Sequence, residues 1–330
     1  MSGSSPAPRL PVIDVAVVGS FMMDLVAAAP RRPEPGETLR GTSFDEHLGG
    51  KGFNQAVAAA RIGARTAMVG RLGDDRYGEE FLSFLDHAGI NRDHVAVQAL
   101  AGTGIGLPVV LPDGSNSIII VPRANDAFTV QDVVAAGQLI RRSRVVLAQL
   151  ELPLEPTLEA LQIGCDGRAI TVLNPAPYHE DVAQFAGRVD IVVPNQLEAE
   201  RMTGLDCSGP GALGAAEYLA REFAARAAVI TLGDLGAVAA IRRQSGAIDT
   251  VSIPAHVVDA VDTVGAGDAF CGALAAQLAL GRDVPSAVSM ANAAAALTTT
   301  RRGSAASTPT IGETEAFIGQ LLRNSLAPGT

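Results

Sequence analysis

The sequence predicts an α/β protein with a mainly parallel sheet covered by helices on both faces. Short apolar segments rich in β-branched residues recur along the chain, and stretches with helical spacing alternate with them. This alternation is typical of a parallel sheet that is buried on both sides. No fixed-period repeat is visible, which argues against a solenoid. The 330 residues, 48% of them hydrophobic, are enough for a large core, so wholesale disorder is excluded.

The predicted elements follow one another from residue 12 onward. Strands are expected at the apolar runs 12–18, 67–70, 145–148, 170–173, 191–194, 228–231 and 255–260. Helices are expected at 52–62, 77–88, 157–163, 198–204, 212–224 and 269–280. Residues 1–11 are small, polar and rich in proline, and we expect them to form a disordered tail. The α/β domain would therefore comprise residues 12–330.

Two early segments interrupt the alternation of strands and helices. Residues 38–48 alternate roughly as a half-exposed strand, and 105–111 with 117–121 form a predicted hairpin around Pro-Asp-Gly-Ser. We interpret residues 36–48 and 105–121 as a discontinuous β lid on the main domain. An ordinary edge hairpin plus a loop is the alternative.

Charge and composition exclude several classes of partner. The formal net charge is −10 without a basic cluster, which argues against sequence-independent binding of nucleic acid. The longest uncharged stretch, 284–300, carries Ser, Asn and Thr and is a poor membrane span. The three cysteines lack the spacing of metal ligands or of a disulfide framework. These features lead us to expect a cytoplasmic protein that binds neither nucleic acid nor membrane.

The segment around residues 261–270 is the strongest candidate for a catalytic site. Gly265 and Gly267 precede an apolar helix, and their N–H groups can form an anion hole at its positive end. Asp268, in the first turn, can take a proton from an attacking hydroxyl. An Asp helix cap after a glycine turn is the structural alternative. The turn after the first strand matches neither a dinucleotide-binding motif nor a P-loop.

Three further polar segments follow predicted strands or open predicted helices. They are 48–55, which contains Gly-Gly-Lys-Gly-Phe-Asn, 194–198, where Asn195 and Glu198 could form a capping box, and the turn at 231–236. Each alone could be a simple turn or cap. All of them lie at the carboxyl ends of predicted strands, where open α/β sheets bind ligands.

The motifs in these segments resemble those of ribokinases, within the phosphofructokinase-B-type carbohydrate kinases. Residues 49–58 look like the first signature of that family and residues 262–270 like the second, and the likeness extends from about Val12 to Leu322. The resemblance implies a ribokinase-like three-layer α/β/α sandwich with a mainly parallel central sheet and a small β-sheet lid. It also implies a homodimer, because the lid often pairs two subunits in this family.

The resemblance further implies a role for each candidate residue in ATP-dependent phosphorylation of the primary 5-hydroxyl of D-ribose. Asp268 would be the general base, and the backbone of Gly265, Ala266 and Gly267 the anion hole. The sugar site would be formed by Met22, Asp24, Gly50, Lys51, Asn54, Glu151 and Asp268. ATP would contact Asn195, Thr231, Leu232, Gly233, Asp234, Leu235, Gly236, Gly267 and Asn292. Glu198 would hold Mg²⁺ through water, and an activating K⁺ would be bound by Asp262, Val264, Thr298, Arg301, Gly303 and Ser307.

The chain departs from the family pattern at three positions. Met22 stands where many ribokinases carry an Asn, so a sugar hydroxyl there would lose a polar partner. Phe53 replaces the usual alanine and would face either the sugar pocket or the core, and Asn292 replaces a frequent histidine. Ribose remains the leading substrate. The alternatives are a kinase of 2-deoxyribose, of another sugar or of a nucleoside, and, more remotely, a non-catalytic protein that senses sugar or nucleotide.

Overall fold

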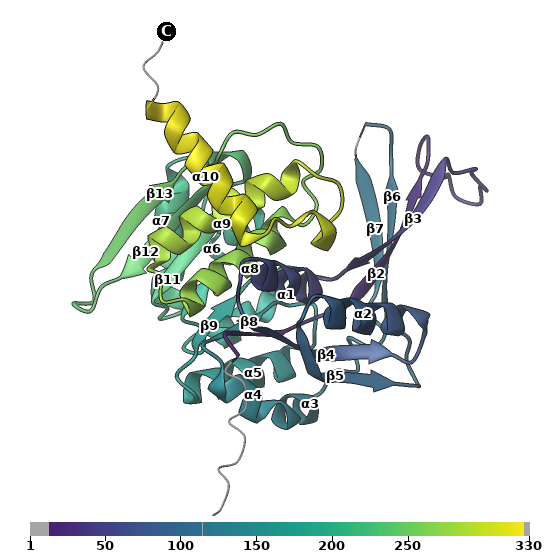
Figure 1. Ribbon diagram of the computed structural model, residues 1–330, viewed down its shortest axis with the longest axis horizontal. Coiled ribbons are helices and arrows are strands. Elements are labelled where there is room, and N and C mark those ends of the chain that lie inside the picture. Colours follow the sequence, from purple (N-terminus) through teal and green to yellow (C-terminus); the bar gives the residue numbers. More distant parts are fainter. Residues whose placement is uncertain (1–12, 114, 327–330) are drawn as a thin grey trace, which may run out of the picture.

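The computed structural model, which describes residues 13–113 and 115–326, contains a nine-stranded central sheet (Figure 1). The strand order is β13-β12-β11-β10-β9-β8-β1-β4-β5, and the strands from β11 to β5 are parallel. β12 and β13 extend one edge as antiparallel strands. The strands are β1 (Val15–Val18), β4 (Thr66–Gly73), β5 (Asn91–Gln98), β8 (Val145–Ala148), β9 (Ile170–Leu173), β10 (Ile191–Val192), β11 (Ala227–Thr231), β12 (Ala237–Arg242) and β13 (Ile248–Ile253).

Helices cover both faces of this sheet, which confirms the predicted three-layer architecture. Each face has its own apolar cluster, because alternate residues of the buried strands point to opposite sides. One face packs against α1 (Lys51–Arg61), α2 (Arg76–His87), α8 (Ala266–Ala279) and α9 (Val284–Thr299), with α10 (Ile311–Leu326) beside α9. The other packs against α3 (Val130–Ala135), α4 (Gly137–Arg142), α5 (Leu154–Asp166), α6 (Gln196–Thr203) and α7 (Gly211–Glu222).

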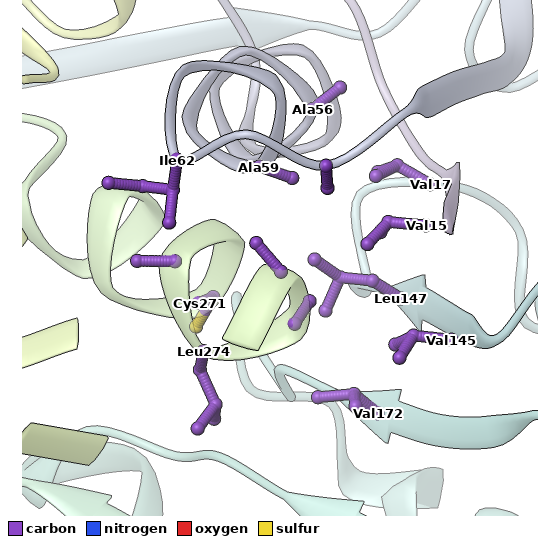
Figure 2. Packing of buried hydrophobic residues seen from close by; sticks show 14 of the residues in the cluster. Val15, Val17, Ala56, Ala59, Ile62, Val145, Leu147, Val172, Cys271 and Leu274 are labelled. Atoms are coloured by element: carbon purple, nitrogen blue, oxygen red, sulfur yellow. The ribbon is translucent and has the colours of Figure 1, made fainter. Parts of the chain in front are cut away.

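The core beneath α1 and α8 places two chemically important helix starts side by side. Figure 2 shows Ala56 and Ala59 of α1 above Cys271 of α8, with the labelled valines of β1 and β8 to the right of both helices. The small side chains let the two helices approach closely; at Gly272, for example, a Cβ would lie 2.4 Å from the carbonyl oxygen of Gln55. This packing brings the first turns of α1 and α8 to the same edge of the sheet.

Phe53 belongs to the core and not to the sugar pocket. Its side chain is fully buried, and its ring centroid lies 4.8 Å from that of Phe81 and 5.2 Å from that of Phe84, both on α2. Phe21 completes the aromatic cluster. The structure therefore resolves the two alternatives for this residue in favour of packing.

The long uncharged stretch at 284–300 forms α9, which packs between α8 and α10. Within the described residues, every helix is too short or too polar to cross a lipid bilayer.

A second sheet, in the order β3-β2-β6-β7, projects beside the main domain (Figure 1). Its strands are β2 (Met22–Ala28), β3 (Ser43–Gly49), β6 (Gly104–Val110) and β7 (Asn116–Val121). β3, β6 and β7 fall in the segments assigned to the lid, although residues 37–42 are irregular. We refer to this sheet as the lid.

Two sequence predictions of local structure were wrong, and one lies outside the described residues. Met22–Asp24, which we assigned to the turn after the first predicted strand, instead begin strand β2. Residues 255–260, predicted as a strand, have no regular structure, and Val257 is 96% exposed. β13 already forms the edge of the sheet, so this apolar run has no neighbouring strand to pair with. The predicted tail at 1–11 lies outside the described residues.

Candidate active site

A pocket of about 230 Å³ lies at the carboxyl ends of β9, β10 and β11. Open α/β sheets bind ligands at this edge. Residues from α1, α6 and α8 complete the wall, so several predicted segments meet here. The lining residues are Lys51, Asn174, Ala176, Val193, Asn195, Glu198, Thr231, Gly265, Gly267, Asp268 and Cys271.

A larger and more open groove, of about 700 Å³, lies between α3, α5 and the 3₁₀ turn Glu180–Phe185. None of the predicted site residues borders it. Its lining residues are Val130, Leu154, Glu155, Leu158, Glu159, Gln162, Gln184 and Arg188. The smaller pocket is therefore the candidate active site.

The Asp268 carboxylate is held by two amide side chains of α1. Asn54 Nδ2 donates to Asp268 Oδ2 at 3.0 Å, and Gln55 Nε2 donates to Asp268 Oδ1 at 2.9 Å. All three side chains are buried, with Asp268 8% exposed at the pocket wall. Hydrogen bonds to both oxygens fix the plane of the carboxylate and leave its other lone pairs toward a ligand. This geometry would allow the carboxylate to accept a proton from a hydroxyl group in the pocket.

The first turn of α8 presents backbone N–H groups to the pocket. Gly265 precedes the helix with φ of +79°, a conformation that favours glycine, and Gly265 and Gly267 both line the cavity. The Ala266 N–H donates to the Thr263 carbonyl at 3.3 Å, whereas those of Gly267 and Asp268 have no partner within residues 13–113 and 115–326. Unpaired N–H groups at a helix start attract anions.

Lys51 opens α1 and faces a group of acidic side chains. Burial alone would lower the pKa of Lys51, but Asp268, Glu151 and Glu198 together raise it above its ordinary value. Burial raises the pKa of both Glu151 and Glu198, which Lys51 partly opposes. The raised pKa keeps the Lys51 ammonium protonated, and it is a cation at the wall of the pocket.

Glu151 is tied to the start of α1 by two hydrogen bonds. Its Oε2 accepts the Lys51 N–H at 2.8 Å and also the hydroxyl of Ser20. The carboxylate thus holds the helix start that carries Lys51 and Asn54. Ser20, which sequence reasoning did not single out, is fully buried beside it.

Asp24 lies on the lid, in a slot made by two glycines of the neighbouring strands. A Cβ at Gly106 would lie 2.2 Å from Asp24 Oδ1, and a Cβ at Gly49 would lie 2.4 Å from Asp24 Oδ2. Burial, with Glu151 and Asp268 nearby, raises the pKa of Asp24 to about 6. Its carboxylate accepts no hydrogen bond from the described residues, and it is available to a ligand between the lid and the main domain.

Met22 points to the same side of β2 as Asp24, because residues two apart on a strand share a face. It is 5% exposed, yet it belongs to neither apolar cluster of the main domain. Met23, on the opposite side, joins the core. Met22 thus lies on the side of the lid that carries Asp24, and its place in a sugar site stays a prediction.

Asn195 and Glu198 form the capping box of α6. Asn195 N–H donates to Glu198 Oε2, and Glu198 N–H donates to Asn195 Oδ1, both at 2.9 Å. Glu198 Oε1 has no hydrogen-bond partner within the described part of the chain. Asn195 and Glu198 also line the pocket, so a role as helix cap does not prevent them from contacting a ligand.

The segment Thr231–Gly236 continues this wall. Thr231 ends β11, pairs with Asn195 and borders the pocket. The 3₁₀ turn Gly233–Leu235 follows, closed by a 2.8 Å hydrogen bond from the Leu232 N–H to the Gly236 carbonyl. Leu232 is buried, whereas Asp234 and Leu235 are exposed.

Asn292 lies apart from the pocket lining. Its Nδ2 donates to the carbonyl oxygens of Ile253 and Pro254 at 3.2 and 3.3 Å. The amide therefore fastens α9 to the segment that leaves β13.

The residues predicted to bind a cation lie in the loop before α8 and in a second segment, formed by the end of α9 and the residues after it, and the two segments are joined directly. Asp262 Oδ2 accepts the Gly303 N–H and Oδ1 accepts the Val264 N–H, both at 3.0 Å. Ser307 Oγ donates to the carbonyl oxygens of Gly303 and Ser304. The Thr298 carbonyl accepts the Arg301 N–H at 3.2 Å, and Arg61 of α1 donates to the carbonyls of Ala306 and Thr308. The predicted donors are all oxygens, which suits a hard cation.

Gln55, Gln149 and Asn174 also belong to the site, although the sequence analysis gave them no role. Gln149 follows β8 and Asn174 follows β9, so their positions at strand ends were a usable signal. Their mutual contacts were not, because they join residues up to 119 positions apart. Cys271, also unforeseen, lies under the pocket, and burial raises the pKa of its thiol well above the ordinary value. Among the described residues, no group of three or more His, Cys, Asp or Glu side chains could hold a metal ion.

Comparison with known proteins agrees with this geometry. The family model for pfkB family carbohydrate kinases matches residues 12–311. Ribokinase of Bacillus subtilis is 38% identical over 307 residues, covering 92% of this chain and 99% of that protein. Deoxyribokinase of Salmonella typhi is 33% identical over 307 residues, covering 93% and 99%.

Among solved structures, Arabidopsis thaliana ribokinase complexed with ribose and ATP has a TM-score of 0.83 at 28% identity. The match covers 93% of this chain and 99% of that one. The two proteins thus share one overall fold.

Proposed function

Because the chain belongs to the pfkB family of carbohydrate kinases, we propose that it transfers the γ-phosphoryl group of ATP to the primary 5-hydroxyl of D-ribose. The products are ribose 5-phosphate and ADP. The observation that carries the proposal is the Asp268 carboxylate, fixed by Asn54 and Gln55 beside the N–H groups that open α8. Ribokinases at 33–40% identity over most of the chain supply the choice of sugar.

In the proposed reaction, Asp268 takes the proton of the sugar 5-hydroxyl while the hydroxyl oxygen attacks the γ-phosphorus. A new O–P bond forms as the bond between the γ-phosphorus and the bridging oxygen of ADP breaks. The N–H groups at Gly265–Gly267 and the Lys51 ammonium offset the negative charge that spreads over the transferring group. Asp24, Glu151 and Asn54 orient the sugar, and Asn195 with Thr231–Gly236 hold ATP. Asn292 acts from outside the pocket, by holding α9 against the segment that leaves β13.

Asp268→Asn tests the mechanism, because an amide cannot accept the proton. Turnover should fall by about 10²–10⁴, the usual contribution of a general base. ADP release with ribose is the measurement, and Asp126→Asn, an exposed Asp outside the site, is the matched control. Undiminished turnover in Asp268→Asn would contradict the mechanism. Absence of turnover by the unaltered protein with every sugar offered, together with binding of sugar or nucleotide, would support a sensing protein instead.

A second candidate substrate, 2-deoxyribose, is favoured by Met22. A thioether cannot donate a hydrogen bond, so a hydroxyl placed against Met22 would lose a partner. Met22→Asn should therefore raise the ratio of kcat/KM for ribose to that for 2-deoxyribose by about tenfold, which is 1.4 kcal/mol. A coupled assay of both sugars, with other sugars and nucleosides alongside, measures the ratio. An unchanged ratio would contradict the proposal that Met22 contacts the sugar.

The donor sets also fit Mg²⁺ and K⁺. We propose that Glu198, whose Oε1 is unpaired within the described residues, holds the water shell of Mg²⁺. K⁺ would lie among Asp262, Ser307 and the carbonyls of Val264, Thr298, Arg301 and Gly303. When bound, Mg²⁺ neutralises phosphate charge. The K⁺ site is supported by the joined loops at Asp262 and Gly303.

We further propose a homodimer formed through the lid, acting in the cytoplasm. β7 is an edge strand, and Ile118, Ile119, Ile120 and Val121 along it are all exposed. Monomeric proteins seldom expose such a strand, and a second copy would cover it. The free cysteines at 165, 207 and 271 and the use of ATP suit a reducing compartment.

A further inference from the structure

A chain of three buried amides ends on the Asp268 carboxylate. Gln149 Nε2 donates to Gln55 Oε1 at 2.7 Å, and Gln55 Nε2 donates to Asp268 Oδ1 at 2.9 Å. Gln55 also donates to Asn174 Oδ1 at 3.0 Å, and Asn174 Nδ2 donates to the Val193 carbonyl at 2.8 Å. The residues come from α1, α8 and the segments that follow β8 and β9, so the network joins four parts of the fold at the active site.

The contacts of Gln55 determine the orientation of its amide. A primary amide has two N–H donors and one carbonyl acceptor. The two donors of Gln55 face oxygens of Asp268 and Asn174, and its acceptor faces the amide nitrogen of Gln149. Turning the amide over would place its oxygen against two other oxygens. Gln55 is 0% exposed, so no water can replace a lost partner from solvent.

Gln149 contributes to this orientation at a cost to stability. Its side chain is 1% exposed, and its Oε1 is buried without a hydrogen-bond partner among the described residues. A buried acceptor without a partner destabilises the folded state. An apolar side chain of similar length would remove this unpaired acceptor but would leave the buried Gln55 Oε1 without its donor, so the two effects on stability would largely cancel.

We propose that Gln55 and Gln149 are positioning residues that hold the Asp268 carboxylate in its productive orientation. The inference rests on the proposed function, in which Asp268 takes the proton of the sugar hydroxyl. Asn54 holds Oδ2 and Gln55 holds Oδ1, so the carboxylate can turn only if one of them lets go. Gln149 acts one step further away, by keeping the N–H side of Gln55 toward Asp268.

This role has a kinetic signature that a packing role lacks. The side chains of Gln55 and Gln149 are 0% and 1% exposed, so neither reaches a bound substrate directly. Their loss should therefore lower kcat and leave the KM values for sugar and ATP nearly unchanged. The two residues act in series on one carboxylate, so their effects should not multiply.

The test uses methionine, which keeps the length of glutamine and removes its hydrogen bonds. Gln55→Met should lower kcat by about tenfold or more, a misplaced base losing part of its ~10²–10⁴ contribution. Gln149→Met should lower kcat by about threefold while its melting temperature changes little, because one unpaired buried acceptor replaces another. The double variant should be no slower than about twice Gln55→Met. Gln277→Met, on α8 but outside the network, is the matched control and should keep its kcat.

The outcomes separate this inference from the proposed function. Turnover by the unaltered protein and its loss in Asp268→Asn establish the reaction independently of Gln55 and Gln149. If both methionine variants then keep full kcat, the positioning role is wrong although the kinase activity stands. Independent, multiplying losses, or a loss that follows melting temperature in all three variants, would likewise overturn it. If Gln55→Met fails to fold, Gln149→Met alone tests the proposal: a lower kcat at unchanged melting temperature supports the positioning role, and an unchanged kcat contradicts it.

Discussion

Lys51 is the only lysine in the sequence, and it shares one site with four acidic residues. Three of them, Glu151, Glu198 and Asp268, raise its pKa, and the fourth, Asp24, lies on the lid above. One ammonium cannot neutralise this group. Phosphates of ATP would enter a site that is already acidic, so a second cation is needed to offset their charge. At the scale of single residues, this argues for the Mg²⁺ proposed beside Glu198.

Asp24 gives a prediction about stability and pH. Its pKa is raised to about 6 from the ordinary 3.8, so the folded protein keeps a proton that the unfolded chain releases between these values. The free energy of unfolding therefore decreases as pH rises from about 4 to about 6. Above that range the carboxylate is ionised in both states, and the destabilisation is complete. Asp24→Asn should raise the free energy of unfolding by about 1–3 kcal/mol near pH 8 and change it little near pH 4.

Urea unfolding at the two pH values measures this difference. Asp126→Asn, at an exposed position, should show no such pH dependence. The same Asp24→Asn variant should bind sugar more weakly, because a ligand-facing carboxylate is lost. A stability gain that is equal at both pH values, or absent near pH 8, would show that Asp24 does not titrate as described.

At the scale of elements, the strand ends were the predictable part of the site. Apolar runs located β9, β10 and β11, and the pocket lies at the ends of these strands. β2 was missed because the chain leaves one sheet at Val18 and enters the other at Met22, and no local pattern tells which sheet a strand joins. Residues 255–260 have strand-like composition, but a strand also needs a partner, which only tertiary structure supplies.

The glycine slot in the lid gives a prediction at this scale. Gly106 of β6 pairs with Asp24 of β2, and a Cβ there would lie 2.2 Å from the Asp24 carboxylate. Alanine fits a strand, so Gly106→Ala should preserve the lid and displace only the carboxylate. We expect the KM for sugar to rise about tenfold, equivalent to 1.4 kcal/mol, while the KM for ATP stays nearly constant.

Initial-rate kinetics with each substrate varied in turn provide the measurement. Gly214→Ala is the control, because Gly214 lies on α7 and a Cβ added there would face open space. Equal changes in both KM values would point to general damage of the lid, and unchanged values would mean that Asp24 can move aside without loss.

At the scale of the whole molecule, the sequence predicted the architecture better than the contacts within the site. The two signature segments, residues 49–58 and 262–270, specify which helix starts meet, and α1 and α8 do pack together. The amide chain from Gln149 through Gln55 to Asp268 could not be read in this way. Its hydrogen bonds span 94 and 213 positions, and they depend on how the sheet orders its strands.

The lid provides the last prediction, because its outer strand is apolar on both faces. Residues alternate across a strand, so Ile118 and Ile120 point to the side of Asp24, and Ile119 and Val121 to the other. Ile119 is 67% exposed and pairs with Leu107, which is also exposed. Ile119→Lys places a charge in the proposed dimer interface and should shift the sedimenting species from dimer to monomer at micromolar concentration. Val134→Lys, at an exposed apolar position on α3, should leave the dimer intact. A protein that sediments as a monomer before any substitution, or a dimer that survives Ile119→Lys, would refute assembly through this strand.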